Sequence, residues 1–349
     1  MGYNLPLPAE RKPSCVFRQH AVSTFMPVLI PMLSSQLSDL LDPYLVPLSQ
    51  PKHRLFHGRG KTVPSLEWLT VDCFPPVLVA TLFRPQDEEV LAGLEASLGG
   101  ALAGLGCQTL VFQHRYDGKA ENVVVAGELP DSPVATEQGL DYKLDFQRGQ
   151  NLGFFADMAE GRRWIRERAE GRKVLNLFSF TCSFSVAALA GGAHSVVNID
   201  LSDAALTLGK QNHALNGFQD ARVHYLPHNI FRSWKKLHSL GRYDLIVVDP
   251  PSAQKGSFMA EKDYPKALRK LHKLLAPEAE LLICLNAPWL DYAWLEQCVA
   301  DNLPGAELQA RLSGASGFDE AGEPALKTLH YRYQRPVMLD VSADAGQGA

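Results

Sequence analysis

The tetrad Asp249-Pro-Pro-Ser252 follows directly on the apolar run Tyr243–Val248. Proline fixes φ and has no backbone N–H, so Pro250 and Pro251 in succession end a strand and make the next loop rigid. An acidic side chain beside such a loop is suited to hold a planar acceptor next to a reactive group. Taken alone, the tetrad is explained at least as well as a plain strand ending, so the other strand ends must decide.

Three further polar groups follow predicted strands upstream. Ser179-Phe-Thr-Cys-Ser183 comes after the run 174–178 and opens a helix, where small and hydroxyl residues let the backbone approach a ligand. Asp200 ends the next run, where a carboxylate either accepts ribose hydroxyls or caps the following helix. Asn229 follows a third run and is either an adenine contact, with Ile230 packing on the ring, or an ordinary loop asparagine.

The combination of these strand ends favours a nucleoside cofactor. The Gly-x-Gly-x-x-Gly pattern of dinucleotide enzymes is absent, which argues against an NAD oxidoreductase. A carboxylate about two dozen residues after a small-residue loop fits a ribose. An Asp-Pro-Pro rim one strand further supplies a place for a planar acceptor. Together they indicate S-adenosylmethionine.

The elements that position these residues alternate regularly from residue 172 onward. Short buried runs, typical of parallel strands, alternate with amphipathic helical patterns. This rhythm predicts an α/β fold with a doubly wound, Rossmann-like sheet whose ligands lie at the carboxyl ends of the strands. Strands are expected at 174–178, 195–200, 223–226, 245–248 and 280–284, and helices at about 183–190, 203–216 and 265–276.

A smaller α/β domain is expected ahead of this sheet. It packs one helix, 86–103, on a mostly antiparallel sheet. Its strands are predicted at 69–74, 77–83, 109–114 and 123–126. A further strand at 140–146 is expected to lead into the larger domain. The predicted organisation is a partly disordered N-terminal extension at 1–60, the small domain at 61–146, the larger domain at 147–337 and a flexible tail at 338–349.

Composition describes an ordinary globular chain of 349 residues, 46% hydrophobic and 21% charged, with a net charge of −4. Nucleic-acid binding would therefore need a local basic patch. The six cysteines form no Cys-x-x-Cys pair, so neither a metal site nor a disulfide framework is predicted, and a reducing cytoplasmic setting fits. The apolar stretch 25–33 is short and broken by prolines, so no membrane span is expected.

The stretch from about 140 to 335 resembles a class I S-adenosylmethionine-dependent methyltransferase. It is similar to the RlmI/RlmK-type family, which methylates large-subunit ribosomal RNA. The residues that carry the resemblance are Gly149-Gln-Asn-Leu-Gly-Phe-Phe-Ala-Asp157, Val174–Val186, Asn198-Ile-Asp-Leu-Ser202 and Asp249-Pro-Pro-Ser252. The first block is the most specific, because generic methyltransferases lack it. The domain at 61–146 also matches the family's central domain in position.

The resemblance implies a set of roles. The turn 178–182 lies under the methionine part of S-adenosylmethionine, Asp200 takes the ribose hydroxyls, and Asn229 and Ile230 frame the adenine. Asp249 with Pro250 and Pro251 faces the methyl group and the target base. The implied cofactor contacts are Gln150, Gly153, Phe154, Asn176, Phe178, Thr181, Cys182, Asp200, Leu201, Asn229, Ile230 and Asp249. The sequence departs from relatives in lacking first-turn glycines and in having asparagine at 229 where aspartate is common.

The positions of the cysteines bear on which atom of the substrate accepts the methyl group. Methylating carbon 5 of a pyrimidine requires a cysteine that adds covalently to the ring. Asn286 falls at the position where the resemblance implies that cysteine, and Cys284 is expected inside a strand. Nitrogen methylation of a base is therefore predicted, with Asp249 and Asn286 at the base edge. The predicted catalytic set is Asp249, Pro250, Pro251 and Asn286.

The partner implied by the resemblance is RNA, and a homodimer is left open. The helix at 265–276 carries lysines and an arginine on one face, which is either a phosphate contact or a solvated surface. His57-Gly-Arg-Gly60 is either an anion-binding turn or a plain turn. Two alternatives remain: a methyltransferase acting on a small molecule or a protein, and a non-catalytic protein that binds an adenosine ligand.

Overall fold

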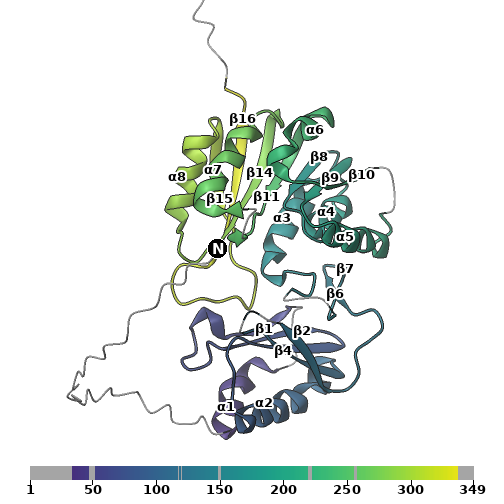
Figure 1. Cartoon of the computed structure of the whole chain (residues 1–349), viewed down its shortest axis with the longest axis vertical. Helices are drawn as coiled ribbons and strands as arrows, with labels where there is room; N and C mark the ends of the chain where they lie inside the picture. The colour runs from purple at the N-terminus through teal and green to yellow at the C-terminus, as the bar shows by residue number, and fades with distance from the viewer. Residues whose placement is uncertain are drawn as a thin grey trace, which may run out of the picture.

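The computed structural model describes residues 34–46, 52–116, 118, 120–147, 151–218, 222–254 and 258–336. Gln150, the expected tail and most of the expected extension lie outside these ranges. The described chain forms two units, one above the other in Figure 1. The smaller is built on a five-stranded sheet and the larger on a seven-stranded sheet.

The smaller unit has the strand order β1-β2-β3-β4-β5, in which only β3 and β4 are parallel neighbours. The predicted mostly antiparallel sheet is thus present. Its elements are α1 (Ser34–Leu41), η1 (Asp42–Tyr44), β1 (Arg54–His57), η2 (Gly58–Gly60), β2 (Leu69–Phe74), β3 (Val77–Leu82), α2 (Glu88–Ala101), η3 (Ala103–Leu105), β4 (Thr109–His114) and β5 (Glu121–Ala126). Two helices cover the sheet rather than one, and both α1 and β1 come from the range assigned to the extension.

Alternation along β3 and β4 gives this sheet two different faces. One face packs against α1 and α2 through Leu78, Ala80, Leu82, Leu110 and Phe112. The opposite face points toward the larger unit. Val77, Val79 and Val111 are buried there, and the next residues on the same face, Thr81 and Gln113, line a cleft. The face therefore changes from apolar to polar along the strands.

A hairpin and a helix join the two units. These are β6 (Val134–Glu137), β7 (Leu140–Lys143), η4 (Ala156–Met158) and α3 (Ala159–Arg168). The strand expected at 140–146 ends at Lys143, because the N–H of Leu144 then donates to Pro133 O and that of Asp145 to Leu152 O. Arg162 of α3 is only 2% exposed and donates from Nε to Glu137 Oε1 at 2.7 Å. One continuous apolar cluster runs from β3 through this hairpin into the larger sheet.

The larger sheet has the order β10-β9-β8-β11-β14-β16-β15, and the first five strands are parallel. This is the predicted doubly wound architecture, with an added antiparallel pair, β15 and β16, that the sequence analysis missed. The elements are β8 (Lys173–Leu177), α4 (Ser183–Ala190), β9 (Ser195–Asp200), α5 (Asp203–Leu215), β10 (Val223–Pro227), η5 (Ile230–Arg232), α6 (Trp234–Ser239), β11 (Tyr243–Val248), β12 (Ala253–Gln254), β13 (Phe258–Met259), α7 (Ala260–Leu271), β14 (Leu275–Asn286), α8 (Tyr292–Asn302), β15 (Ala306–Arg311) and β16 (Leu326–Gln334).

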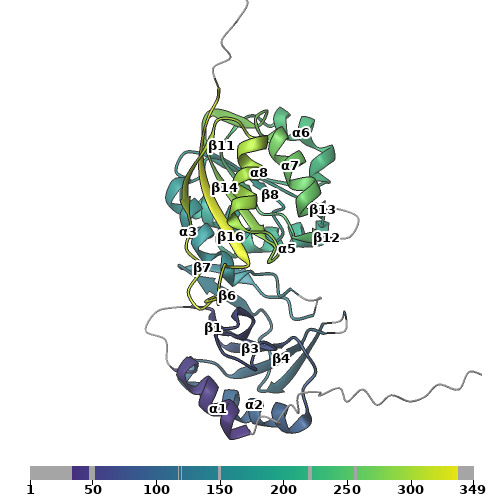
Figure 2. The same cartoon turned by 90° about the vertical axis from the view of Figure 1, so that its left-hand side faces the viewer.

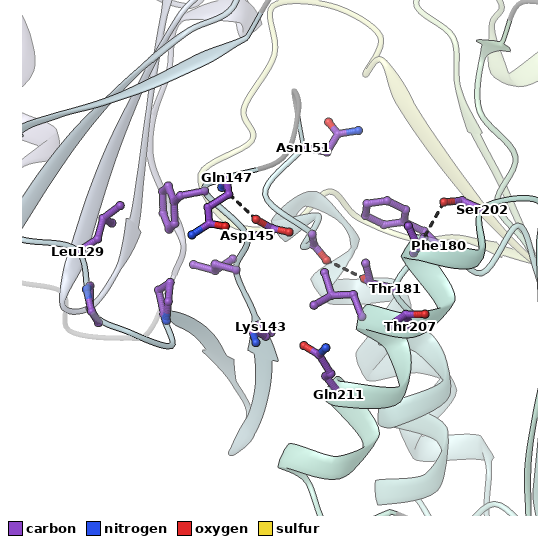
Figure 3. A pocket seen from close by; sticks show the side chains of 18 of the residues that line it. Leu129, Lys143, Asp145, Gln147, Asn151, Phe180, Thr181, Ser202, Thr207 and Gln211 are labelled. Atoms are coloured by element: carbon purple, nitrogen blue, oxygen red, sulfur yellow. Dashed lines mark hydrogen bonds between the residues drawn. The ribbon is translucent and has the colours of Figure 1, made fainter.

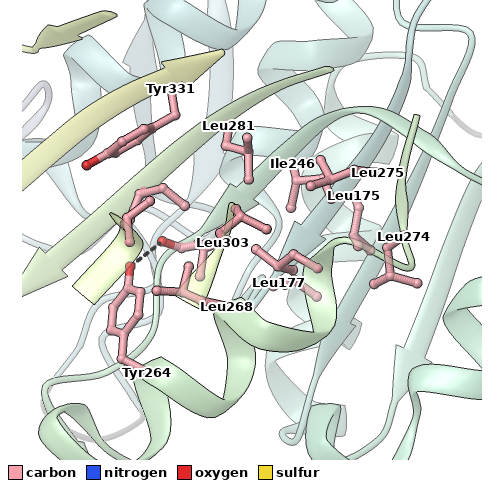
Figure 4. Close-up of a cluster of buried hydrophobic side chains, with 14 of the residues drawn as sticks. Leu175, Leu177, Ile246, Tyr264, Leu268, Leu274, Leu275, Leu281, Leu303 and Tyr331 are labelled. Carbon is pink, nitrogen blue, oxygen red and sulfur yellow. Dashed lines mark hydrogen bonds between the residues drawn. The ribbon is translucent and has the colours of Figure 1, made fainter. Parts of the chain in front are cut away.

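Helices cover both faces of the larger sheet. Figure 2 shows α7 and α8 on one side and α3 on the other, and each side has its own apolar cluster. Tyr264 of α7 is fully buried in the first cluster (Figure 4). Its hydroxyl donates to Cys284 O at 2.6 Å. A weaker contact of 3.4 Å reaches Val248 O. One side chain thus ties the ends of β11 and β14 together.

Helix α7 corrects the sequence analysis at both of its ends. A helix was expected at 265–276, whereas the structure has it at Ala260–Leu271. Proline favours the first turn of a helix, which placed the predicted start at Pro265. In the structure Pro265 lies inside the helix. Leu275 and Ala276 belong instead to β14, where Leu275 pairs with Tyr243.

Candidate active site

The loop after β8 is held in an unusual backbone conformation. Phe178, Phe180 and Cys182 have φ values of +57°, +44° and +63°, all in the left-handed region. Non-glycine residues adopt that region at a cost of about 1–2 kcal/mol each. Such strain concentrates at functional sites, because the surrounding structure must enforce it. The loop therefore forms a tight turn without any glycine. Two of its three left-handed residues are phenylalanines, whereas small and hydroxyl residues were expected to let the backbone approach a ligand.

Asp200 connects this loop to the end of β9. The Phe180 N–H donates to Asp200 Oδ2 at 2.9 Å, and the Ser202 N–H donates to Oδ1 at 2.8 Å. Helix α5 is capped by Ser202, whose Oγ accepts from Ala205 N at 3.2 Å, so Asp200 is not the cap. Each carboxylate oxygen retains a lone pair for a further donor, such as a ribose hydroxyl.

Gly153 and Thr181 meet in a first cleft, of about 760 Å³. Thr181 Oγ1 donates to Gly153 O at 2.6 Å. Gly153 has φ +96°, and a Cβ there would lie 2.9 Å from Leu208 Cδ2, so both backbone and space require glycine. Figure 3 shows Phe180 and Thr181 on one side of this cleft and Asp145 and Gln147 on the other. Gly153 belongs to the block 149–157 and Thr181 to the block 174–186, so the two blocks that carry the resemblance are in contact at this cleft.

Asn176 and Cys182 lie in the interior. Asn176 Nδ2 donates to Asn198 Oδ1 at 3.0 Å, and that side chain donates in turn to Ser185 Oγ at 3.0 Å. Asn176 Oδ1 is buried without a hydrogen-bond partner. Cys182 is fully buried under α5, close to Gly209. Asn176 thus ties β8 to β9, and Cys182 packs the turn against α5. The contact of either residue with a cofactor stays a prediction.

The predicted adenine contacts lie at the start of η5. Asn229 Oδ1 accepts from the Phe231 N–H at 2.9 Å, so its acceptor is partly used in capping the turn and its NH₂ remains a donor. Ile230 is only 4% exposed and belongs to the same buried apolar cluster as Leu177. Leu201, by contrast, is 54% exposed directly after the ribose candidate, as a surface for a planar ring requires.

Asp249 and Asn286 stand at the carboxyl ends of the neighbouring parallel strands β11 and β14. Val248 is in register with Ile283, so Asp249 leaves the sheet beside the end of β14. Ser252 Oγ donates to Asn286 O, which fastens the Asp-Pro-Pro loop to that strand end. The predicted catalytic residues are thus brought to one edge of the sheet.

The electrostatics of this edge are set by two carboxyl groups. Burial, and secondly the nearby Asp157, raise the pKa of Asp249 to about 7, while Arg162 opposes the shift. Burial also raises the pKa of Asp157, whose Oδ1 is buried without a hydrogen-bond partner. A carboxyl group with a pKa near neutrality is poised to hold or release a proton. Asp157 ends the block Gly149–Asp157, and its position in the sequence alone indicated no role for it.

A second cleft, of about 750 Å³, lies between the two units and is called here the inter-unit cleft. Asn286, Asp157 and Phe154 line it from the larger unit. The ring of Phe154 stacks on Tyr142 with centroids 4.9 Å apart, and the Arg162 guanidinium lies 4.3 Å from its centroid. Phe154 is therefore part of the packing between the units, and its cofactor contact stays a prediction.

Cys284 is enclosed in β14 as expected. It is fully buried, and burial raises its pKa well above that of a free thiol. Every cysteine in the part of the chain that the structure describes is free and buried. Within the same ranges no group of three or more histidine, cysteine or acidic side chains is placed to hold a metal ion, and no helix is long and apolar enough to cross a membrane.

Fold and site together define a class of protein. A parallel sheet of order β10-β9-β8-β11-β14, followed by antiparallel β16, presents a strained turn, an acidic strand end and an Asp-Pro-Pro loop along one edge. This is the Rossmann-like architecture of nucleoside-cofactor transferases. The family model of S-adenosylmethionine-dependent methyltransferases matches residues 53–332, and the chain belongs to that family.

Curated relatives and a solved structure agree with this assignment. The chain is 33% identical over 189 residues to "Ribosomal RNA large subunit methyltransferase I" of Aeromonas hydrophila, covering 52% of this chain and 48% of the relative. It is 35% identical over 158 residues to "Ribosomal RNA large subunit methyltransferase K/L" of Shewanella pealeana, covering 44% and 22%. The chain thus spans about half the length, or less, of these relatives. The solved structure titled "Crystal structure of SMU.776, a putative methyltransferase complexed with SAH" has the same fold, with a TM-score of 0.72, 21% identity and coverage of 86% of this chain and 79% of that chain.

Proposed function

We propose that this chain is an S-adenosylmethionine-dependent methyltransferase whose substrate is a base of RNA, in particular of large-subunit ribosomal RNA. The RNA substrate is supported by the names of the curated relatives. The observation that carries the chemistry is the pairing of the Asp-Pro-Pro loop with Asn286 at one strand edge. A small-molecule or protein substrate is distinguished from RNA by the fraction in which a transferred methyl label is found.

The residues along this edge fit S-adenosylmethionine. The Phe178–Cys182 turn forms a cradle, and the carboxylate of Asp200 keeps free lone pairs beside it. Asp200 would hold the ribose, Leu201 the adenine face and the turn the methionine part. When bound, the cofactor supplies an electrophilic methyl group on a sulfonium. The chain's own contribution is to fix the target base next to that group and to keep water away.

Nitrogen is the favoured acceptor because Cys284 cannot reach a base. Its side chain has no exposed surface, and its raised pKa keeps it a thiol. Asp249 and Asn286 can instead bind the edge of a base, and Asp249 can accept the proton that a nitrogen loses on methylation. Its pKa of about 7 suits both the protonated and the ionised form at neutral pH.

The test is transfer of a labelled methyl group to ribosomal RNA taken from cells that lack the gene, followed by nucleoside analysis. We expect label in a nitrogen-methylated base. Cys284→Ser should retain transfer within about twofold, whereas Asp249→Asn should lose at least about a hundredfold. Label at carbon 5 of a pyrimidine, together with an inactive Cys284→Ser that still folds, would contradict nitrogen transfer. Label confined to a protein or small-molecule fraction would support the alternative substrate.

A further inference from the structure

The inter-unit cleft has a second wall that the proposed chemistry does not use. This wall belongs to the smaller unit and includes Phe83, Arg59 and Arg115, besides Thr81 and Gln113. Arg59 lies in η2, Phe83 follows β3 and Arg115 follows β4. The three side chains come from separate parts of the chain, and the fold of the smaller unit brings them together.

Arg59 and Arg115 share one aromatic ring. The Cζ atoms of Arg59 and Arg115 lie 4.5 Å and 5.7 Å from the centroid of Phe83. Burial, and secondly the charge of Arg59, lower the pKa of Arg115. Two like charges in such proximity repel each other, so a bound anion would stabilise the pair. Phe83 holds both guanidinium groups against one ring.

The turn that carries Arg59 is itself built for close packing. A Cβ on Gly58 would lie 1.9 Å from Leu66 O, and one on Gly60 would lie 2.0 Å from Asp319 O. The two glycines of His57-Gly-Arg-Gly60 are therefore explained by backbone contacts. The arginine between them is exposed at the cleft and has no such structural explanation.

The acidic side chains of the cleft do not neutralise this pair. Neither Arg59 nor Arg115 forms an ion pair or a side-chain hydrogen bond with any residue that the structure describes. The acids of the cleft contact other groups, as follows: Asp72 binds Arg54 at 2.6 Å, Glu160 binds Arg163, Glu320 accepts from Ala325 N and Glu323 accepts from Tyr292 N. Asp157, the remaining acid, is buried near Arg54 and Arg162.

We propose that Arg59 and Arg115, held against Phe83, bind a phosphate of the RNA backbone while the target base enters the same cleft toward Asn286. Guanidinium groups are planar, always charged and able to form paired hydrogen bonds with phosphate oxygens. A phosphate contact positions a strand without reading its sequence. The proposal rests on the proposed function, and it makes the smaller unit a binding wall of the inter-unit cleft.

The probe is a fluorescein-labelled single-stranded RNA of mixed sequence, about 12 nucleotides long. Its affinity is measured by anisotropy between about 50 and 200 mM salt. We expect Arg59→Ala combined with Arg115→Ala to raise Kd roughly tenfold and to reduce the slope of log K against log salt by about 0.7, as loss of one phosphate contact predicts. The KM for RNA should rise while kcat stays within about twofold.

The matched control is Arg84→Ala. Arg84 follows Phe83 directly but lies outside the cleft lining, 61% exposed and 3.7 Å from Glu67. Its substitution removes one positive charge, half of what the double variant removes, and should change Kd less than twofold, with an unaltered salt slope. Arg115→Lys keeps the charge and should give an intermediate Kd. Calorimetry with S-adenosylmethionine and thermal unfolding confirm that each variant is folded.

The outcomes separate this proposal from the proposed function. If the double variant binds RNA with wild-type Kd and salt slope, the phosphate site is wrong, even where methyl transfer to RNA occurs. If RNA binding depends on the pair but no RNA is methylated, the phosphate site stands and the proposed function fails. If the wild-type protein binds inorganic phosphate in calorimetry through Arg59 and Arg115, but the double variant keeps the wild-type affinity for RNA, the ligand of the pair is a free phosphate. The RNA proposal is then overturned. A wild-type protein that neither binds nor methylates RNA contradicts both.

Discussion

At the scale of single residues, the acid–base behaviour of Asp249 depends on which groups surround it in the fold. The sequence supplies an acid before two prolines, and the structure adds Asp157 close enough to help raise its pKa to about 7. No spacing rule could have revealed this pair, because the two residues are 92 positions apart and meet only through the fold. The position of Asp200 was predictable, since it ends a recognisable strand. Gly153 and Asn286 came instead from the family resemblance, and the roles of all three residues stay predictions.

The raised pKa of Asp249 makes stability depend on pH. Its folded value of about 7 exceeds the 3.8 of an unfolded aspartate, so the folded protein binds the extra proton between these values. Stability is therefore highest below about pH 4 for this group and falls as pH rises through 7. Asp249→Asn should be more stable than wild type by about 1–2 kcal/mol at about pH 8, allowing for partial exposure, and no more stable at about pH 4.

Chemical unfolding at both pH values measures this difference. Glu278→Gln, at an exposed position of β14, serves as the control, and its free energy of unfolding should stay within about 0.5 kcal/mol of the wild-type value. If Asp249→Asn proved less stable than wild type at about pH 8, the Asp249 carboxylate would be stabilised, not strained, in the folded protein.

At the scale of elements, the strained turn after β8 depends on α5 lying close above it. A Cβ on Gly209 of α5 would lie 2.5 Å from Cys182 Sγ, so helix and turn are in direct contact. The sequence predicted β8 and α5 with nearly correct bounds, because the patterns of strands and helices are local. It could not predict the three left-handed residues, since a phenylalanine or cysteine adopts that conformation only when its surroundings enforce it.

Gly209→Ala should therefore destabilise the protein by about 1–3 kcal/mol through overpacking. In the background of Cys182→Gly, which removes Sγ and suits the positive φ, the same change should cost at least about 1 kcal/mol less. Gly99→Ala in α2 is the matched control, because a Cβ there has no neighbour within 4 Å and favours the helix. Denaturant titration of the four-protein cycle gives the coupling, and additive effects would contradict the contact.

At the scale of the whole molecule, the two units pack against each other in a way that composition and periodicity could not predict. One apolar cluster crosses from β3 to the larger sheet, and the segment before β16 returns to the smaller unit, where Ala321 N donates to Gly60 O at 2.7 Å. The expected boundaries separated residues that the structure joins, because contacts between distant segments leave no local trace in a sequence.

Gly60→Ala should destabilise both units together, because its Cβ would meet Asp319 O at 2.0 Å. We expect a loss of about 1–3 kcal/mol and a single cooperative unfolding transition in both proteins. Calorimetry measures the transition, with Gly104→Ala as a control whose Cβ meets nothing within 4 Å. Two separate transitions in the wild-type protein would show that the units unfold independently.

The inter-unit cleft is completed late in the order in which the chain is synthesised. Its walls draw on residues from Arg54 to Thr328, so they come from both ends of the described chain. The smaller sheet can fold as soon as it leaves the ribosome, as N-terminal units generally do. The cleft cannot be completed until β16 has emerged and paired with β14. A nascent chain therefore carries no finished inter-unit cleft, and under the proposed function RNA cannot be held there until β16 has been made.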